Sequence, residues 1–297
     1  MAEIRHISII VLMVSLALNW VSCSMSETLV ACGEDKVLIV KHNPEDLDDH
    51  MITWEWKVTE STDLDQSFQE HMVPTDDCKP VLNNSKLLIT SSGGGVVLLD
   101  IKRKKPLFYA HVPNAHSADL LPKGRIVVAL STAVGGNAIE LYDLSESDRV
   151  LYRDSLYSGH GLVWMPKLKR LFALGHDELR AYSLVDWSSN KPHLRKEKTW
   201  MLPGESGHDL ISVSDDQLLL TTHEGAWSFK ISTEEFTPFA PLEKVPDIKS
   251  IYFDDRNGRI IYTKGETSWW THRIYALSPD KTIQIPDVKM YKVRVMK

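Results

Sequence analysis

A unit of about 40 to 48 residues recurs along this chain, and this repeat restricts the fold more than any other feature of the sequence. The clearest copies begin at His116, His160, His208 and Lys249. Each copy contains a short strand-like segment, a turn, a strongly β-prone run, a second turn and another such run, followed by a weaker fourth segment. Four short antiparallel strands per repeat predict an all-β protein made of similar blades.

The β-prone runs align from copy to copy, and the turns between them are rich in proline, glycine, aspartate and asparagine, which suit tight hairpins. In the second position of the repeat the runs are 86–90, 125–130, 170–174, 217–221 and 259–263. In the third position they are 96–101, 138–144, 179–184, 226–231 and 273–277.

The two ends of the chain complete one further blade. Five full copies lie between Asp77 and Ile285, while segments before them supply three strands and 288–295 supplies a missing first strand. We therefore predict a single domain over 27–297, a six-bladed β-propeller whose terminal strands share one blade. A seventh blade within 64–74 would be too short, and an open double sheet would not explain why the ends are complementary.

The first 23 residues predict an export signal. The apolar stretch from Ile7 to Leu18 is shorter than the roughly 20 residues of a membrane-spanning helix. Small residues precede Cys23, as in a lipoprotein signal, although Trp20 stands where leucine is usual. A lipid anchor at Cys23 and plain cleavage near it both remain open. Either predicts a periplasmic or outer-membrane-anchored protein without a transmembrane helix in its mature part.

Charge and cysteine content limit the partners and the covalent framework. The net charge is −6, and the longest basic run is 102–105, which argues against a nucleic-acid partner. Cys32 and Cys78 would lie in an oxidising compartment, where a disulfide and two free thiols are both open.

Several features together resemble a known family. The lipoprotein-like leader, the opening Val30-Ala31-Cys32-Gly33, the strands that begin with histidine and the closing 269–272 look like uncharacterised secreted or lipoprotein six-bladed propellers of Bacteroidota. The resemblance covers nearly all of the mature chain. It implies the fold, but that family has no settled activity.

Histidines recur at one position of the repeat, where the innermost strand begins. Alignment places His116, His160 and His208 there, with Lys249 and Cys78 in two other blades. The loops between second and third strands open on the same face of the propeller. We therefore expect one central mouth lined by both sets; the loop residues include His176, His223, Trp269, Trp270 and His272.

Three imidazoles from neighbouring blades predict a divalent metal site, for manganese, zinc or calcium, and the same histidines could act as acid and base. The position of these histidines is loosely similar to that in oligogalacturonate-lyase-type propellers. That similarity implies a lyase in which Lys249 binds a uronate carboxylate and Trp269 or Trp270 stacks on a sugar. His223 and His272 would also contact an oligosaccharide or small-molecule ligand.

Other interpretations stay open. Each repeated histidine could instead hydrogen-bond a neighbouring blade, and the two tryptophans could cap the core. The glycines 93–95 lack the lysine of a phosphate-binding loop, and no Gly-x-Ser-x-Gly or His-Glu-x-x-His motif occurs. Two functions therefore compete: processing of an acidic oligosaccharide at a histidine-lined mouth, and non-catalytic binding of a glycan or protein.

Overall fold

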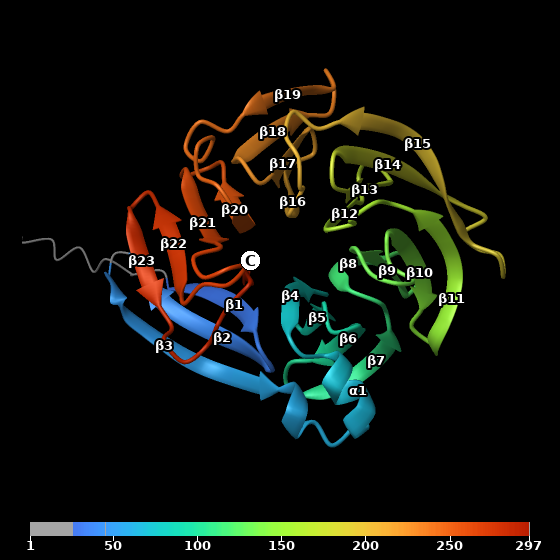
Figure 1. The fold of residues 1–297 in the computed structure, drawn as a ribbon, viewed down its shortest axis with the longest axis horizontal. Coiled ribbons are helices and arrows are strands. Elements are labelled where there is room, and N and C mark those ends of the chain that lie inside the picture. The colour runs from blue at the N-terminus through green and yellow to red at the C-terminus, as the bar shows by residue number, and fades with distance from the viewer. Residues whose placement is uncertain (1–25, 45, 297) are drawn as a thin grey trace, which may run out of the picture.

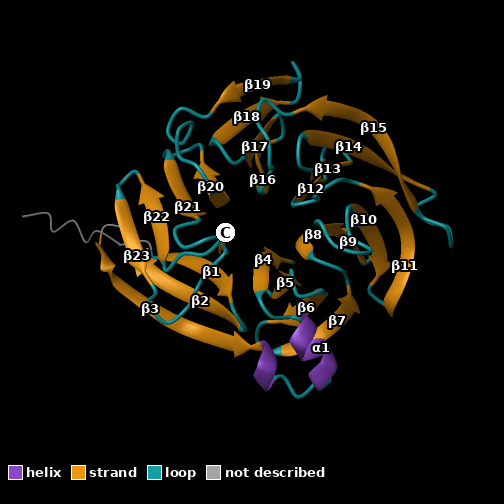
Figure 2. Ribbon diagram, in the orientation of Figure 1, coloured by secondary structure: helices purple, strands orange, loops and turns teal. Residues whose placement is uncertain are grey.

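The computed structural model describes residues 26–44 and 46–296, which form six four-stranded antiparallel sheets in a ring (Figure 1). Strands account for most of the ring, and loops and turns join them (Figure 2). The prediction of a six-bladed β-propeller is confirmed. The predicted leader, 1–23, lies outside the described residues.

Each blade is given from its innermost to its outermost strand. The first blade consists of β24 (Lys292–Val295), β1 (Glu27–Gly33), β2 (Lys36–Asn43) and β3 (Asp46–Lys57). The second and third consist of β4 (Thr75–Val81), β5 (Lys86–Ser91), β6 (Gly95–Asp100) and β7 (Lys105–His111), then β8 (Ala115–Leu121), β9 (Arg125–Leu130), β10 (Ala138–Asp143) and β11 (Glu146–Ser155). The fourth consists of β12 (Gly161–Met165), β13 (Arg170–Leu174), β14 (Glu178–Val185) and β15 (His193–Met201). The fifth and sixth consist of β16 (Asp209–Ser214), β17 (Gln217–Thr221), β18 (Ala226–Lys230) and β19 (Glu235–Pro238), then β20 (Ile248–Asp254), β21 (Arg259–Lys264), β22 (Arg273–Leu277) and β23 (Lys281–Gln284).

Burial explains which strands are strongly apolar. All six residues of β9 and of β6 are buried, because neighbouring blades cover both faces of the middle strands. The outermost β11 has no buried residue. Apolar side chains are therefore concentrated in the second and third strands of each blade.

The ring closes by pairing the two ends of the chain. β24 is antiparallel to β1, in a register that runs from Leu29 opposite Val295 to Cys32 opposite Lys292. The predicted closure is confirmed, although β24 begins at Lys292 and not at Val288. The preceding Met290 instead exchanges backbone hydrogen bonds with Thr271 of the sixth blade, at 2.8 and 3.0 Å, which keeps this segment out of the first sheet.

The hydrophobic core consists of six clusters, each lying between two neighbouring blades. Between the first and second blades, for example, Val30 and Trp56 pack with Leu87 and Val97. Cys32 and Cys78 belong to the same cluster, where both are buried free thiols and not a disulfide. The blades are thus held together by interlocking apolar faces, and a change at one interface affects both neighbours.

The only regular helices among the described residues lie between the first two blades. They are a 3-10 turn, η1 (Val58–Glu60), and α1 (Gln66–His71), whose first turn is capped by Asp65 through a 2.9 Å bond from the Phe68 amide. This segment therefore contains no seventh blade, as predicted. No helix in the described part of the chain is long and apolar enough to span a membrane.

Candidate functional site in the central mouth

One side chain from each blade lies where its innermost strand begins, around the central axis. In each blade, the residue that follows this side chain on the innermost strand pairs with a residue near the end of the second strand. Asp209, which follows His208, for instance pairs with Thr221. In three blades the pairing skips the residue itself, a bulge that turns the side chain out of the ladder. In blade order the six residues are Tyr291, Asp76, His116, His160, His208 and Lys249.

The assignment of Cys78 to this set is wrong. Cys78 lies two residues beyond Asp76, pairs with Ile89 and donates its thiol hydrogen to the Val30 carbonyl at 3.6 Å. It therefore belongs to the core between blades. Asp76 lies ten positions before Lys86, the first residue of β5, and His160 and Lys249 stand at the same distance before their own second strands, whereas Cys78 lies only eight positions before Lys86.

The three predicted histidines lie side by side. The ring centroids of His116 and His160 are 4.3 Å apart, and those of His160 and His208 are 5.6 Å apart. Together with Asp76 and Tyr291 they line a cavity of about 310 Å³. The structure thus brings the expected cluster together in a hollow large enough for a small ligand.

Local hydrogen bonds orient two of the rings. The Nδ1 atoms of His116 and His160 lie 3.3 and 2.9 Å from the carbonyl oxygens of Asn114 and Ser158. A carbonyl can only accept, so Nδ1 carries the hydrogen in both rings and Nε2 keeps its lone pair. Burial lowers the pKa of His116 well below its usual value and that of His160 to about 3, so both rings are neutral near pH 7.

Asp76 is a functional candidate that the sequence did not reveal. Its side chain is buried in the cavity wall, where it accepts a hydrogen bond from the Ser92 amide. Burial raises the pKa of this carboxyl to about 7, against the opposing effect of the Ser92 hydrogen bond. A carboxyl that gains and loses its proton near neutral pH is suited to acid–base chemistry.

Lys249 lies beside His208, and its side chain is 1% exposed. Its Nζ is 3.0 Å from His208 Nε2, 3.4 Å from Asp247 Oδ1 and 5.5 Å from the ring centroid of Trp269. Burial lowers the pKa of Lys249, and Asp247 opposes this effect. The predicted cation is therefore present at the edge of the histidine cluster.

Four buried charged side chains lie on the innermost strands, and three of them, Asp77, Asp209 and Lys292, directly follow the cavity residues Asp76, His208 and Tyr291. Arg294 donates two hydrogen bonds each to Asp77 and Asp209, at 2.7 to 2.8 Å. Lys292 Nζ lies 3.3 Å from Asp209 and donates to the His208 carbonyl at 3.0 Å. Burial alone would raise the pKa of both aspartates, but the two cations outweigh it and keep both ionised. This charge cluster joins the first, second and fifth blades across the axis.

The loop residues predicted to line the mouth are not all together. Trp269 and Trp270 line the cavity, and the Trp270 ring centroid is 5.7 Å from that of Tyr291. His272 instead lines a separate hollow beside Glu266 and Arg273. His176 packs against the exposed Tyr157, with ring centroids 5.3 Å apart, away from the cavity lining.

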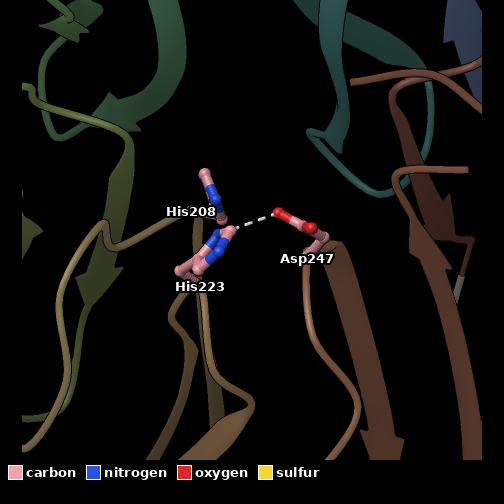
Figure 3. A group of neighbouring side chains, drawn as sticks. All are labelled: His208, His223 and Asp247. Atoms are coloured by element: carbon pink, nitrogen blue, oxygen red, sulfur yellow. Dashed lines mark ion pairs between the residues drawn. The ribbon is translucent and has the colours of Figure 1, made fainter. Parts of the chain in front are cut away.

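His223 belongs to a second group at the rim of the mouth. Its Nδ1 is 3.0 Å from Asp247 Oδ1, and the donor atoms of His208, His223 and Asp247 all lie within 4.8 Å of one another (Figure 3). Among the described residues, this is the one set of three histidine, cysteine or acidic side chains close enough to share an ion. A metal ion shared by His116, His160 and His208 stays a prediction.

A larger hollow, of about 890 Å³, lies away from the mouth between the sixth and first blades. Two pairs of its charged groups already lie in contact: Arg259 lies 3.2 Å from Glu27, and Arg256 lies 2.7 Å from Asp254. The central mouth has more unsatisfied polar atoms in a smaller space, and we take it as the candidate site.

Comparison with known proteins gives a family and a fold. The profile of a family of unknown function (DUF6528) matches residues 26–297. The chain belongs to this family. No curated protein matches this chain. Among solved structures, a chain of the "Crystal Structure of Mitotic Checkpoint Complex" is similar to this DUF6528 propeller, with a TM-score of 0.56 and 12% identity over 84% of this chain and 71% of that one. Identity this low supports the propeller fold alone, and propellers host many unrelated functions.

Proposed function

We propose that this propeller binds the end of an acidic oligosaccharide in the central mouth and cleaves it by elimination. The observation that carries the proposal is the set of six equivalent side chains, one per blade: five of them line a cavity of about 310 Å³, and the sixth, Lys249, lies beside His208. Ligand pockets measure about 300 to 1,000 Å³, so this cavity suits one terminal sugar unit and not the middle of a long polymer.

The side chains supply the groups that elimination from a uronate needs. In the proposed reaction, Nε2 of the neutral His116 takes the proton next to the sugar carboxylate while Lys249 balances the carboxylate charge. The electron pair of that C–H bond forms the new C=C bond as the C–O bond to the leaving sugar breaks. Asp76, in its protonated form, donates its hydrogen to the leaving oxygen. His160 packs against His116 and holds its ring in place.

Non-catalytic binding of a glycan is the second candidate, and the exposure of Trp269 favours it. This side chain is 61% exposed at the mouth, next to Lys249. An exposed indole beside a cation can stack on a sugar ring and hold its carboxylate without any chemistry.

We place either activity in the periplasm or at the outer membrane, as the sequence of the first 23 residues predicts. The intact mass of the protein isolated from its own membranes would show whether Cys23 is the first residue and carries lipid. A mass that retains residues 1–23 would contradict export.

The proposed function is tested with purified protein and a panel of uronate-containing oligosaccharides. We expect ultraviolet absorbance from an unsaturated product, lost in Asp76→Asn and His116→Gln by at least about 100-fold. His193→Gln, an exposed histidine on β15, is the matched control and should retain full activity. Binding without turnover would establish the second candidate instead, and neither binding nor turnover would overturn both.

A further inference from the structure

A compact group of three donors lies at the rim of the mouth, outside the acid–base groups used above. His208 precedes β16, His223 lies between β17 and β18, and Asp247 precedes β20 (Figure 3). The Asp247 amide donates to the His223 carbonyl at 3.0 Å, and Asp247 accepts from Gly265 at 3.0 Å. These backbone bonds fix the two loops together, so the spacing of the donors is a property of the fold.

The side chains also lack a complete set of partners. His208 is 9% exposed, and its Nδ1 has no hydrogen-bond partner. Its Nε2 is 3.0 Å from Lys249 Nζ, which is also 3.4 Å from Asp247 Oδ1. An ammonium group thus lies between two of the three donors. The protein therefore already holds a positive charge between these donors, on a lysine side chain that is almost completely buried.

We propose that His208, His223 and Asp247 bind a divalent transition metal, with zinc as the best match, and that Lys249 occupies the site when the metal is absent. Two imidazoles and a carboxylate are a ligand set that binds zinc or ferrous iron and leaves further positions open to water or substrate. Calcium, which prefers six to eight oxygen ligands, fits this set poorly.

The rearrangement that binding requires is small. In a tetrahedral site with zinc bonds of about 2.0 to 2.2 Å, neighbouring ligand atoms lie about 3.3 Å apart. The three donor atoms in this structure all lie within 4.8 Å of one another. His223, whose side chain is 61% exposed, can close that difference by rotation. Lys249 would move towards the Trp269 ring, which already lies 5.5 Å from its Nζ.

The ion would adjoin the cavity through His208, whose ring lies 5.6 Å from that of His160. Its open positions would then be available to a ligand carboxylate. The occupancy of the site needs no saccharide, so this inference and the proposed function can fail independently.

The test is a titration of the full, metal-free chain with zinc alone by calorimetry, and with cobalt(II) followed by its visible absorbance. We expect one ion per chain. His223→Ala and Asp247→Asn should each weaken binding by at least about 100-fold, beyond the usual effect of a residue that only orients a ligand. His176→Ala, at a histidine that packs against Tyr157 and lies outside the three-donor group, is the control and should bind as the natural chain does.

A second variant, Lys249→Met, should change the zinc affinity in the opposite direction. Removing a competing positive charge should strengthen zinc binding by at least about tenfold. The proposal would be overturned by the absence of binding to the natural chain, by binding that survives His223→Ala, or by weaker binding in Lys249→Met. Because His223 is exposed, a folding defect in its variant is not expected, and circular dichroism would check this.

Discussion

The buried carboxyl of Asp76 should make the stability of the propeller depend on pH in a specific way. Its pKa is about 7 in the folded protein, against 3.8 for an ordinary aspartate, and burial is the main cause. Between these values the folded chain binds more protons than the unfolded chain does. The free energy of unfolding therefore falls as pH rises through this window, and the loss is complete above about pH 8.

The size of the effect follows from the two pKa values. Their separation corresponds to on the order of 4 kcal/mol at pH 8. Asp76→Asn keeps an oxygen that can accept the bond from the Ser92 amide, but it cannot ionise. We expect this variant to equal the natural protein near pH 4 and to be more stable than it at pH 8 by up to that amount.

The assay is urea unfolding between pH 4 and pH 8.5, followed by tryptophan fluorescence. The difference between variant and natural protein cancels the effects of all other acidic groups. Asp63→Asn, at an exposed aspartate outside the cavity lining, is the control for the loss of a carboxylate as such. A constant difference for Asp76→Asn across the range would refute the raised pKa, and with it the acid role given to this residue.

Three further predictions concern the architecture. Arg294→Met should destabilise the protein by about 3 to 5 kcal/mol, because it leaves Asp77 and Asp209 buried without their main counter-charge; an unchanged urea midpoint would contradict this. Removal of 292–297 should leave β1 with an unpaired edge and cause aggregation, and a monodisperse truncated chain in light scattering would count against it. The free thiols Cys32 and Cys78 should react with a thiol reagent only as fast as the chain unfolds, whereas rapid labelling of the folded protein would show that they are accessible.

The fold could be predicted from the sequence because burial is concentrated in two strands of each blade. Runs such as 126–130 in β9 are apolar throughout since both of their faces are covered, and they recur at a regular interval. The outermost strands carry little signal because residues such as those of β11 face solvent. The segment before β24 could not be predicted, because Met290 bonds across to Thr271 in a loop of another blade.

The candidate site was easiest to predict where its residue type repeats, and the repeat also placed Lys249, Trp269 and Trp270 at the mouth. His116, His160 and His208 were found because three copies carry the same side chain. Asp76 and Tyr291 hold the equivalent positions in two other blades, but their residue types differ from histidine, so no repeated side chain marks them. The pairing of His223 with Asp247 joins two loops 24 positions apart in the sequence, and no local pattern specifies such a contact.

The closing strand links completion of the ring to formation of the site. Tyr291, immediately before β24, lines the cavity, while Lys292 and Arg294 on β24 supply the charges that neutralise Asp77 and Asp209. Without these two cations, Asp77 and Asp209 would be buried carboxylates without counter-charges, and their repulsion would oppose a compact ring. A chain whose β24 has not paired with β1 would therefore lack both a closed ring and part of the cavity wall.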